Sequence, residues 1–136
     1  MTKKELNHLQ YQVVGACIEV HKELGPGLLE SVYHKCVKQE LFIRGLKYRS
    51  EPTVKLNFKG IDLDTELRCD FIIEEKIVLE IKTVEAIAPV HEAQLLTYMK
   101  LLKINKGILI NFNSSSIMNN GSRVFVSKEF RELDEG

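Results

Sequence analysis

The chain has 136 residues, with 19 Lys and Arg against 19 Asp and Glu, so its formal net charge at pH 7 is zero. Apolar residue types make up 44% of the sequence, enough for one compact domain with a single hydrophobic core. The charge balance excludes a basic nucleic-acid coat, an acidic tail and a polybasic membrane binder as descriptions of the whole chain.

We therefore expect one domain over residues 1–136, with a core at about 6–127 and a C-terminal tail at 128–136 that frays. The three cysteines have no CxxC spacing, which favours a reducing compartment over a disulfide scaffold. The first residues lack the apolar run of a signal peptide, and no apolar run approaches the ~20 residues that span a bilayer. The sequence thus predicts a cytoplasmic protein outside the membrane.

The first part of the chain predicts two helices. Apolar residues step by three and four from Leu6 to Leu24, the spacing of an amphipathic helix. Gly25-Pro26-Gly27 should end this helix, because glycine takes the left-handed cap and proline blocks continuation. A second helix is expected over about 28–44, with Gly45 as its cap. Its inward face is expected to carry Leu29, Val32, Cys36, Val37 and Leu41.

The apolar pattern then changes to a period of two, which is typical of strands. Residues 54–58 predict a half-buried strand, Lys59-Gly60 a turn, and the alternation continues over 61–69. Cys69 is expected to face away from Asp70 as core filler. The apolar segments 71–73 and 77–79 flank a polar turn and predict a second hairpin.

The last part of the chain predicts one helix and two strands. Pro89 should open a helix that runs to about Leu102, with Ala93, Leu96, Met99 and Leu102 on its inner face. The continuously apolar 107–110 is typical of a strand covered on both faces, and a polar loop at 113–121 precedes a strand at 122–127. Helices on both sides of a mixed sheet pack this order of elements economically, so the predicted class is α/β.

The second hairpin carries a pair of carboxylates. Glu80 and Lys82 share one face of their strand, since alternate residues point the same way. A three-residue loop of Glu74 to Lys76 would place Asp70 directly opposite Glu80, with their Cβ atoms about 5 Å apart. A two-residue loop would place Asp70 opposite Ile81, on the wrong face.

Facing carboxylates repel, and a divalent cation removes the conflict. Mg²⁺ or Mn²⁺ prefers oxygen ligands, which Asp70, Glu80 and the backbone carbonyl of Ile81 could supply. Lys82 could then orient the attacking water and offset charge that grows on a phosphate. The competing interpretation is an exposed Asp70 beside a surface ion pair of Glu80 and Lys82. The strongly apolar flanking residues favour the site.

An acidic residue on one strand followed by Glu-x-Lys on the next resembles the PD-(D/E)XK nuclease superfamily. The segment Gly27-Leu28-Leu29-Glu30-Ser31-Val32-Tyr33 is similar to the GxxExxY signature, which names a family of small bacterial proteins placed in that superfamily. His91–Tyr98 resembles the later helix of that family, so the similarity covers about Leu6 to Val126. It implies a restriction-endonuclease-like fold, a three-layer α/β/α domain with a central mixed β-sheet. Cys69 replaces the proline that precedes the first aspartate in the superfamily.

The resemblance also implies roles for five residues. Asp70 and Glu80 would be the ligands of Mg²⁺ (or Mn²⁺), Lys82 the catalytic lysine, Glu30 the acid of the early helix that completes the site, and Gln94 the polar residue that touches the site or the scissile phosphate. Two of these roles stay open from the residues alone. Glu30 equally suits the positive end of a helix dipole, and Gln94 with Tyr98 equally suits the rim of the core.

The sequence therefore predicts a divalent-metal-dependent nuclease that hydrolyses phosphodiester bonds in nucleic acid, with DNA expected ahead of RNA. The alternative is a catalytically silent nuclease-fold module for binding or assembly. A domain this small could act on both strands of a duplex more readily as a homodimer. Basic residues that could follow phosphates, or simply face solvent, are Lys35, Lys38, Arg44, Lys47, Arg49, Lys100, Lys103 and Lys106.

Overall fold

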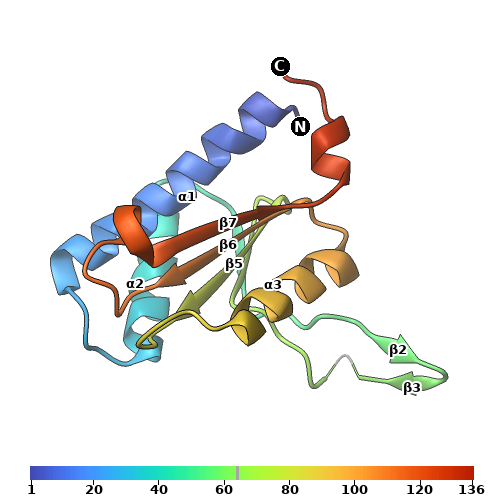
Figure 1. Cartoon of the computed structure of the whole chain (residues 1–136), viewed down its shortest axis with the longest axis horizontal. Coiled ribbons are helices and arrows are strands. Elements are labelled where there is room, and N and C mark those ends of the chain that lie inside the picture. Colours follow the sequence, from blue (N-terminus) through green and yellow to red (C-terminus); the bar gives the residue numbers. More distant parts are fainter. Residues whose placement is uncertain (64) are drawn as a thin grey trace.

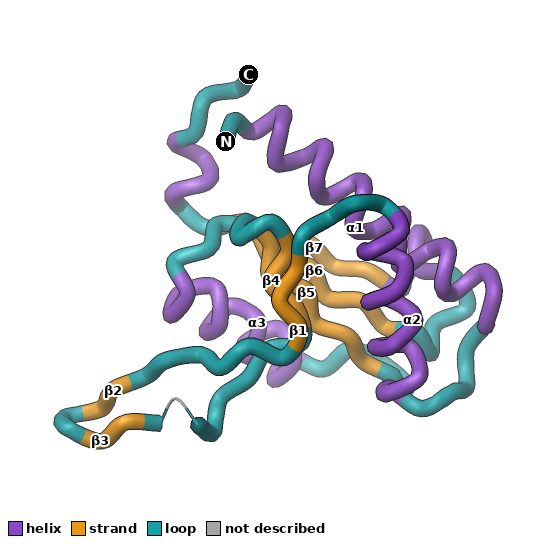
Figure 2. The backbone as a smooth tube through the Cα atoms, turned by 180° about the vertical axis from the view of Figure 1, so that it is seen from behind, coloured by secondary structure: helices purple, strands orange, loops and turns teal. Residues whose placement is uncertain are grey.

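The computed structural model describes residues 1–63 and 65–136. Its centre is a five-stranded sheet in the order β1-β4-β5-β6-β7, formed by Tyr48–Ser50, Phe71–Ile73, Ile77–Lys82, Lys106–Asn111 and Ser122–Val126. β5 and β6 are parallel and the other neighbours are antiparallel, so the sheet is mixed. Figures 1 and 2 show the helices on its two sides. The predicted three-layer α/β/α class is confirmed.

The two faces of the sheet carry separate cores. Phe71 and Ile73 belong to the core under α1 (Lys3–Leu24) and α2 (Glu30–Ile43). Ile72 and Val78 instead pack under α3 (Pro89–Leu102). This alternation follows from the two-residue period of a strand and buries β5 and β6 on both sides. Among the described residues, no helix has the length and apolar character that crossing a bilayer requires.

The early helices have the predicted ends but a different inner face on α2. Gly25 and Gly45 follow the two helices with φ of 68° and 73°, a region that glycine enters without strain. Tyr33 is fully buried, because its ring stacks on Phe112 and its hydroxyl donates to the carbonyl of Gly25. Burial of this ring sets which side of α2 faces the sheet. Leu29 and Val32, which were predicted to face inward, are therefore exposed, while Val37 and Leu41 are buried as predicted.

The inner face of α3 also differs from the prediction. Leu95, Tyr98 and Met99 are buried, whereas Ala93 and Leu96 are exposed. The cause is Gly107 on β6, which leaves space for the helix. A Cβ at this position would lie 2.5 Å from Met99 Sδ and 2.9 Å from Leu95 Cδ1. The helix therefore packs on the sheet through Met99, as predicted, and through Leu95 in place of the predicted Leu96.

A side chain at this contact is expected to loosen the domain. Gly107→Val should lower the free energy of unfolding by about 1–3 kcal/mol, the usual effect of overpacking a core. Urea denaturation measures the change, and Gly15→Val, in α1, provides a comparison in which the new Cβ would meet only the flexible end of the Arg44 side chain. An unchanged midpoint for Gly107→Val would contradict the packing described here.

The strands before Asp70 differ most from the prediction. β1 was not predicted, because three residues are too few to show alternation. The expected strands over 54–58 and 61–69 reduce to β2 (Asn57–Phe58) and β3 (Ile61–Asp62), which form a ribbon separate from the main sheet. Phe58 is 58% exposed, so the prediction of a half-buried strand is wrong at this position.

The C-terminal part is more ordered than the polar sequence indicates. The predicted loop contains a short π-helix, Ile117–Gly121, in which Ile117 is buried. The expected frayed tail forms a 3₁₀ turn at Glu129–Glu132, and the carbonyls of Asp134 and Glu135 then accept hydrogen bonds from the first turn of α1. The tail is thus attached to the N-terminal helix.

Candidate active site

The β4–β5 hairpin has the predicted register. Its ladder pairs Phe71 with Leu79 and Ile73 with Ile77, which leaves a three-residue loop of Glu74 to Lys76. The next row brings Asp70 to Glu80. The side-chain Oδ2 of Asp70 accepts a hydrogen bond of 2.7 Å from the backbone N–H of Ile81, so the carboxylate reaches across to β5.

The backbone bends at Asp70, and this changes the position of Cys69. Cys69 packs in the core under α3, on the side of the two carboxylates, rather than facing away from the site. Burial and the nearby charges of Glu80 and Asp70 raise the pKa of its thiol to about 12. The residue is core filler, as expected, but the alternation that predicted its direction fails at the bend.

Glu80 is the unusual residue of the site. It is 4% exposed, and its Oε1 is buried without a hydrogen-bond partner among the described residues. Burial, the charge of Asp70 and a hydrogen bond with the Asp70 side chain raise the pKa of Glu80 to about 9. An ionised carboxylate with an unpaired oxygen is costly in a protein interior, and a bound cation would relieve that cost.

Lys82 and Glu30 lie beside the carboxylate pair of Asp70 and Glu80. Lys82 follows Glu80 on the same face of β5, and its charge lowers the pKa of both Glu80 and Glu30. Partial burial and the charge of Asp70 act in the opposite direction and raise the pKa of Glu30. In the part of the chain that is described, Lys82 belongs to no ion pair within 4.0 Å. Its ammonium group is therefore available to an anion.

The GxxExxY segment explains how Glu30 is held. Gly27 has φ of 100°, and Glu30 begins α2 directly after the turn. The buried Tyr33 fixes that turn, since its hydroxyl donates to the Gly25 carbonyl and accepts from the N–H of Leu28. The glycine allows the turn and the tyrosine fastens it, so the glutamate between them is directed toward Asp70 and Lys82.

Gln94 and Tyr98 approach the carboxylates from α3. Tyr98 is 6% exposed, and burial followed by the charges of Glu80, Cys69 and Asp70 raises its pKa. The side chain of Gln94 hydrogen-bonds to Tyr98, one turn away. Gln94 itself is exposed, so it lies at the margin of the site while Tyr98 contributes to the wall. The structure thus brings all five predicted residues to the same end of the sheet.

Asn111 is a supporting residue that the sequence did not single out. It ends β6 beside Lys82 and is 4% exposed. Its side chain accepts from the N–H groups of Val84 and Asn113 and donates to the carbonyl of Val84. These bonds hold the loop that leaves β5 directly after Lys82. The available signal was an amide residue at the end of an otherwise apolar strand.

Removing this amide is expected to destabilise the site end of the sheet. Asn111→Ala should lower the free energy of unfolding by about 1–3 kcal/mol, because half-buried backbone groups of Val84 lose their partners. Asn119→Ala, at an exposed position of the π-helix, is the matched control. Chemical denaturation of both variants measures the difference, and equal midpoints would contradict the role given to Asn111.

The donor set suits one ion with few protein ligands. Within residues 1–63 and 65–136, no three His, Cys, Asp or Glu side chains converge closely enough to hold a metal. Mg²⁺ usually takes only one or two carboxylates and completes its octahedron with waters and substrate phosphates. The unpaired Oε1 of Glu80 beside Asp70 therefore fits this mode of binding.

Several basic residues are occupied elsewhere. Arg44 pairs with Glu40, and Arg49 makes a bidentate pair with Glu75. Lys106 is buried under the ring of Phe130 and donates to two side-chain amides of α1. These three residues do not extend a phosphate path.

Comparison with known proteins agrees with this geometry. The model of the PD-(D/E)XK nuclease superfamily matches residues 7–124. No curated protein and no solved structure matches the chain. The matched span includes the acidic pair, Lys82 and both helices that reach the site. The chain belongs to the PD-(D/E)XK nuclease superfamily.

Proposed function

We propose that the protein is a divalent-metal-dependent nuclease that hydrolyses phosphodiester bonds, acting on DNA ahead of RNA. The observation that carries the proposal is the buried carboxylate of Glu80, which lies against Asp70 with one oxygen unpaired and has Lys82 beside it. Superfamily membership supports a nuclease and a nucleic-acid substrate. We further infer that the chain belongs to the GxxExxY group, since Gly27, Glu30 and Tyr33 each have a structural reason at their position.

Asp70 and Glu80 would hold Mg²⁺ or Mn²⁺, with the carbonyl of Ile81 as a further oxygen. The ion would supply Lewis-acid polarisation of the phosphate and a cation for the charge that develops during cleavage. Hydrolysis forms a bond from a water oxygen to phosphorus and breaks a phosphorus–oxygen ester bond. The protons of that water end on the leaving oxygen and on the new phosphate.

The side chains around the ion would position the phosphate and neutralise the charge that develops on it. The ammonium of Lys82 would hold a phosphate oxygen and stabilise the extra negative charge of the transition state. Glu30, with its raised pKa, would take and return a proton at the margin of the site. Gln94 would donate its amide to the phosphate, and Tyr98 keeps that amide in place.

Cleavage assays with single-stranded, duplex and branched DNA and with RNA test the proposal. We expect fragments in the presence of Mg²⁺ or Mn²⁺ and none in EDTA. Binding of nucleic acid without cleavage in either metal would instead support the catalytically silent module.

The three cysteines are free, the state that a reducing cytoplasm maintains. We therefore propose that the enzyme acts there, and the assays should be run with a thiol reductant present.

A further inference from the structure

A projecting arm is the largest feature that the nuclease site leaves unexplained. The arm is defined here as residues 54–63, which carry β2 and β3. It extends away from the three layers in Figures 1 and 2, and its strands pair with each other and not with the main sheet. Its base is fixed by the bridge of Thr53 with Arg68 and by the hydrogen bond from Val54 N–H to the Leu67 carbonyl.

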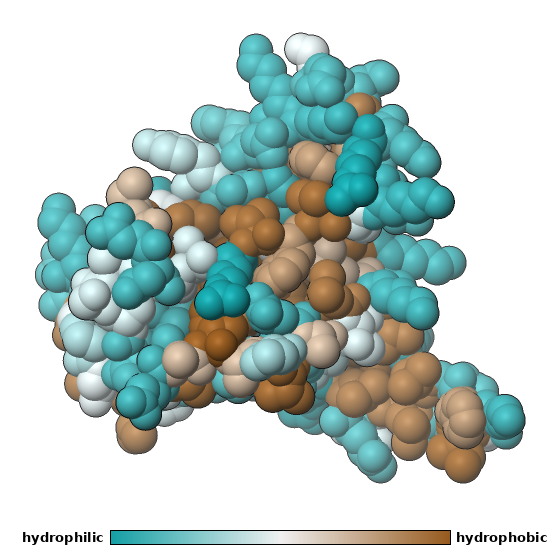
Figure 3. Space-filling model, viewed as in Figure 1, coloured by the Kyte–Doolittle hydropathy of each residue, from teal (hydrophilic) through white to brown (hydrophobic). Residues whose placement is uncertain are grey.

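One face of the arm is apolar along its whole length. Phe58 pairs with Ile61, and Leu63 donates its N–H to the carbonyl of Leu56, so these four side chains share a face with Val54. Their exposure increases outwards: Val54 is fully buried, Leu56 and Leu63 are half-buried, and Phe58 and Ile61 are 58% and 60% exposed. Figure 3 shows apolar atoms gathered on this projection.

An isolated two-stranded ribbon has little stability in water. A ribbon that places a phenylalanine and an isoleucine at its tip therefore needs a protein surface to cover them. The opposite face is polar, with Lys55, Asn57 and Asp62 exposed. The occupant must accordingly cover one face only.

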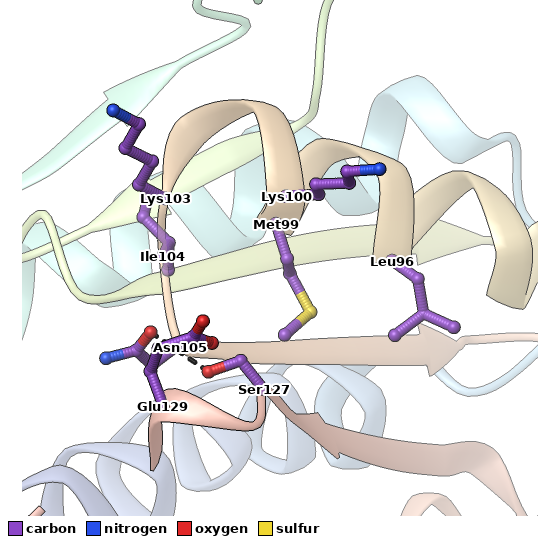
Figure 4. A pocket seen from close by; sticks show the side chains of 8 residues that line it. All are labelled: Leu96, Met99, Lys100, Lys103, Ile104, Asn105, Ser127 and Glu129. Carbon is purple, nitrogen blue, oxygen red and sulfur yellow. Dashed lines mark hydrogen bonds between the residues drawn. The ribbon is translucent and has the colours of Figure 1, made fainter. Parts of the chain in front are cut away.

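A groove on the same molecule has the complementary character. It lies between the second half of α3 and the end of β7, with a volume of about 570 Å³ (Figure 4). Leu96, Met99 and Ile104 line it, and Leu96 is 45% exposed. Lys100 and Lys103 extend from the end of α3 at its margin. None of the five proposed site residues lines the groove.

We propose that the arm of one copy of this chain inserts its apolar face into the α3–β7 groove of a second copy. The apolar side chains of Phe58 and Ile61 would meet Leu96 and Met99. The volume is in the range of ~300–1,000 Å³ typical of pockets that hold small groups, so it suits a few side chains.

The area of one arm–groove contact is too small for a stable dimer, so each copy must insert its arm into the groove of the other. A stable interface buries about 800 Å² on each partner, while one aromatic ring buries about 150–250 Å². One arm in one groove is therefore too small. Two arms related by a twofold axis double the contact, and each copy supplies both an arm and a groove.

A nucleic acid is a less suitable occupant of the arm. The polyanion gains affinity from lysine and arginine, whereas the arm carries two lysines, Lys55 and Lys59, and its tip presents the exposed apolar side chains of Phe58 and Ile61. The inference does not depend on the proposed nuclease activity.

Light scattering of the chain after gel filtration tests the inference. The wild type should elute as a dimer, and Phe58→Asp with Ile61→Asp should elute as a monomer with an unchanged circular dichroism spectrum. Leu96→Glu should have the same effect from the groove side. Phe42→Asp is the matched control, because Phe42 is 70% exposed and lies outside both surfaces.

A second experiment identifies the contact. Ile61→Cys mixed with Leu96→Cys should form a disulfide-linked dimer under mild oxidation, and neither variant alone should do so at the same rate. A monomeric wild type across the concentration series, or an arm variant that stays dimeric, would overturn the proposal. So would an arm variant that keeps its mass but loses DNA binding, which would assign the arm to nucleic acid.

Discussion

Replacing Lys82 with alanine is expected to reduce metal-dependent cleavage by about 100- to 1,000-fold, the usual loss when one charge-stabilising donor is removed from an active site. The reason is its position. Lys82 follows Glu80 on the same face of β5, influences both Glu80 and Glu30, and belongs to no ion pair within 4.0 Å among the described residues.

The matched control is Lys76→Ala. Lys76 is exposed in the turn of the same hairpin, at the opposite end of β5. It should keep full activity, so that general loss of positive charge is separated from the loss of Lys82. Equal cleavage by Lys82→Ala and the wild type would contradict the role of this residue and would trace the activity to another site or a contaminant.

Replacing Glu80 with glutamine is expected to stabilise the metal-free protein at alkaline pH while abolishing cleavage. Burial and the charge of Asp70 raise the pKa of Glu80 from 4.5 to about 9. The folded protein thus binds this proton more tightly than the unfolded chain. The contribution of Glu80 to stability is fully present below the unfolded pKa and is lost as pH rises toward 9.

Glutamine cannot ionise, so this loss does not occur in the variant. At about pH 8 without metal, Glu80→Gln should exceed the wild type in free energy of unfolding by about 1–3 kcal/mol, and the difference should vanish near pH 4. Mg²⁺ should raise the melting temperature of the wild type and leave that of the variant unchanged. Glu85→Gln, at an exposed position after β5, is the control. A variant less stable than the wild type at both pH values would contradict the claim that ionisation of buried Glu80 destabilises the metal-free protein.

The sequence predicted the hairpin that carries the site because strong local patterns specify it. The segments 71–73 and 77–79 are fully apolar around a polar turn, and only the three-residue loop places Asp70 opposite Glu80. The helix ends were equally local, since Gly25, Gly45 and Pro89 act through their own backbone preferences.

The inner faces of α2 and α3 could not be predicted in this way. A helical stripe of Leu and Val indicates burial, yet Tyr33 on α2 and the space above Gly107 on β6 decided which side turned inward. Both are tertiary contacts between distant parts of the chain. Likewise, the direction of Cys69 depended on a bend at Asp70 that an alternating pattern does not reveal.

For the site itself, strand geometry predicted Asp70, Glu80 and Lys82 as candidate residues. The sequence left Glu30 open between a helix-dipole role and a site role. The structure brings Glu30 near Asp70 and Lys82, and it adds Asn111 as the residue that holds the loop after Lys82. That loop is held from the neighbouring strand β6, a tertiary contact to which only the amide at the end of an apolar strand pointed.

Anomalous diffraction from crystals of the wild type grown with Mn²⁺ tests the metal site most directly. We predict an anomalous peak at the end of β5, bonded to the carboxylates of Asp70 and Glu80, with Oε1 of Glu80 no longer unpaired. The absence of a peak at this pair with Mn²⁺ in excess, and with Glu80 still hydrogen-bonded to Asp70, would contradict a metal-dependent nuclease at this site.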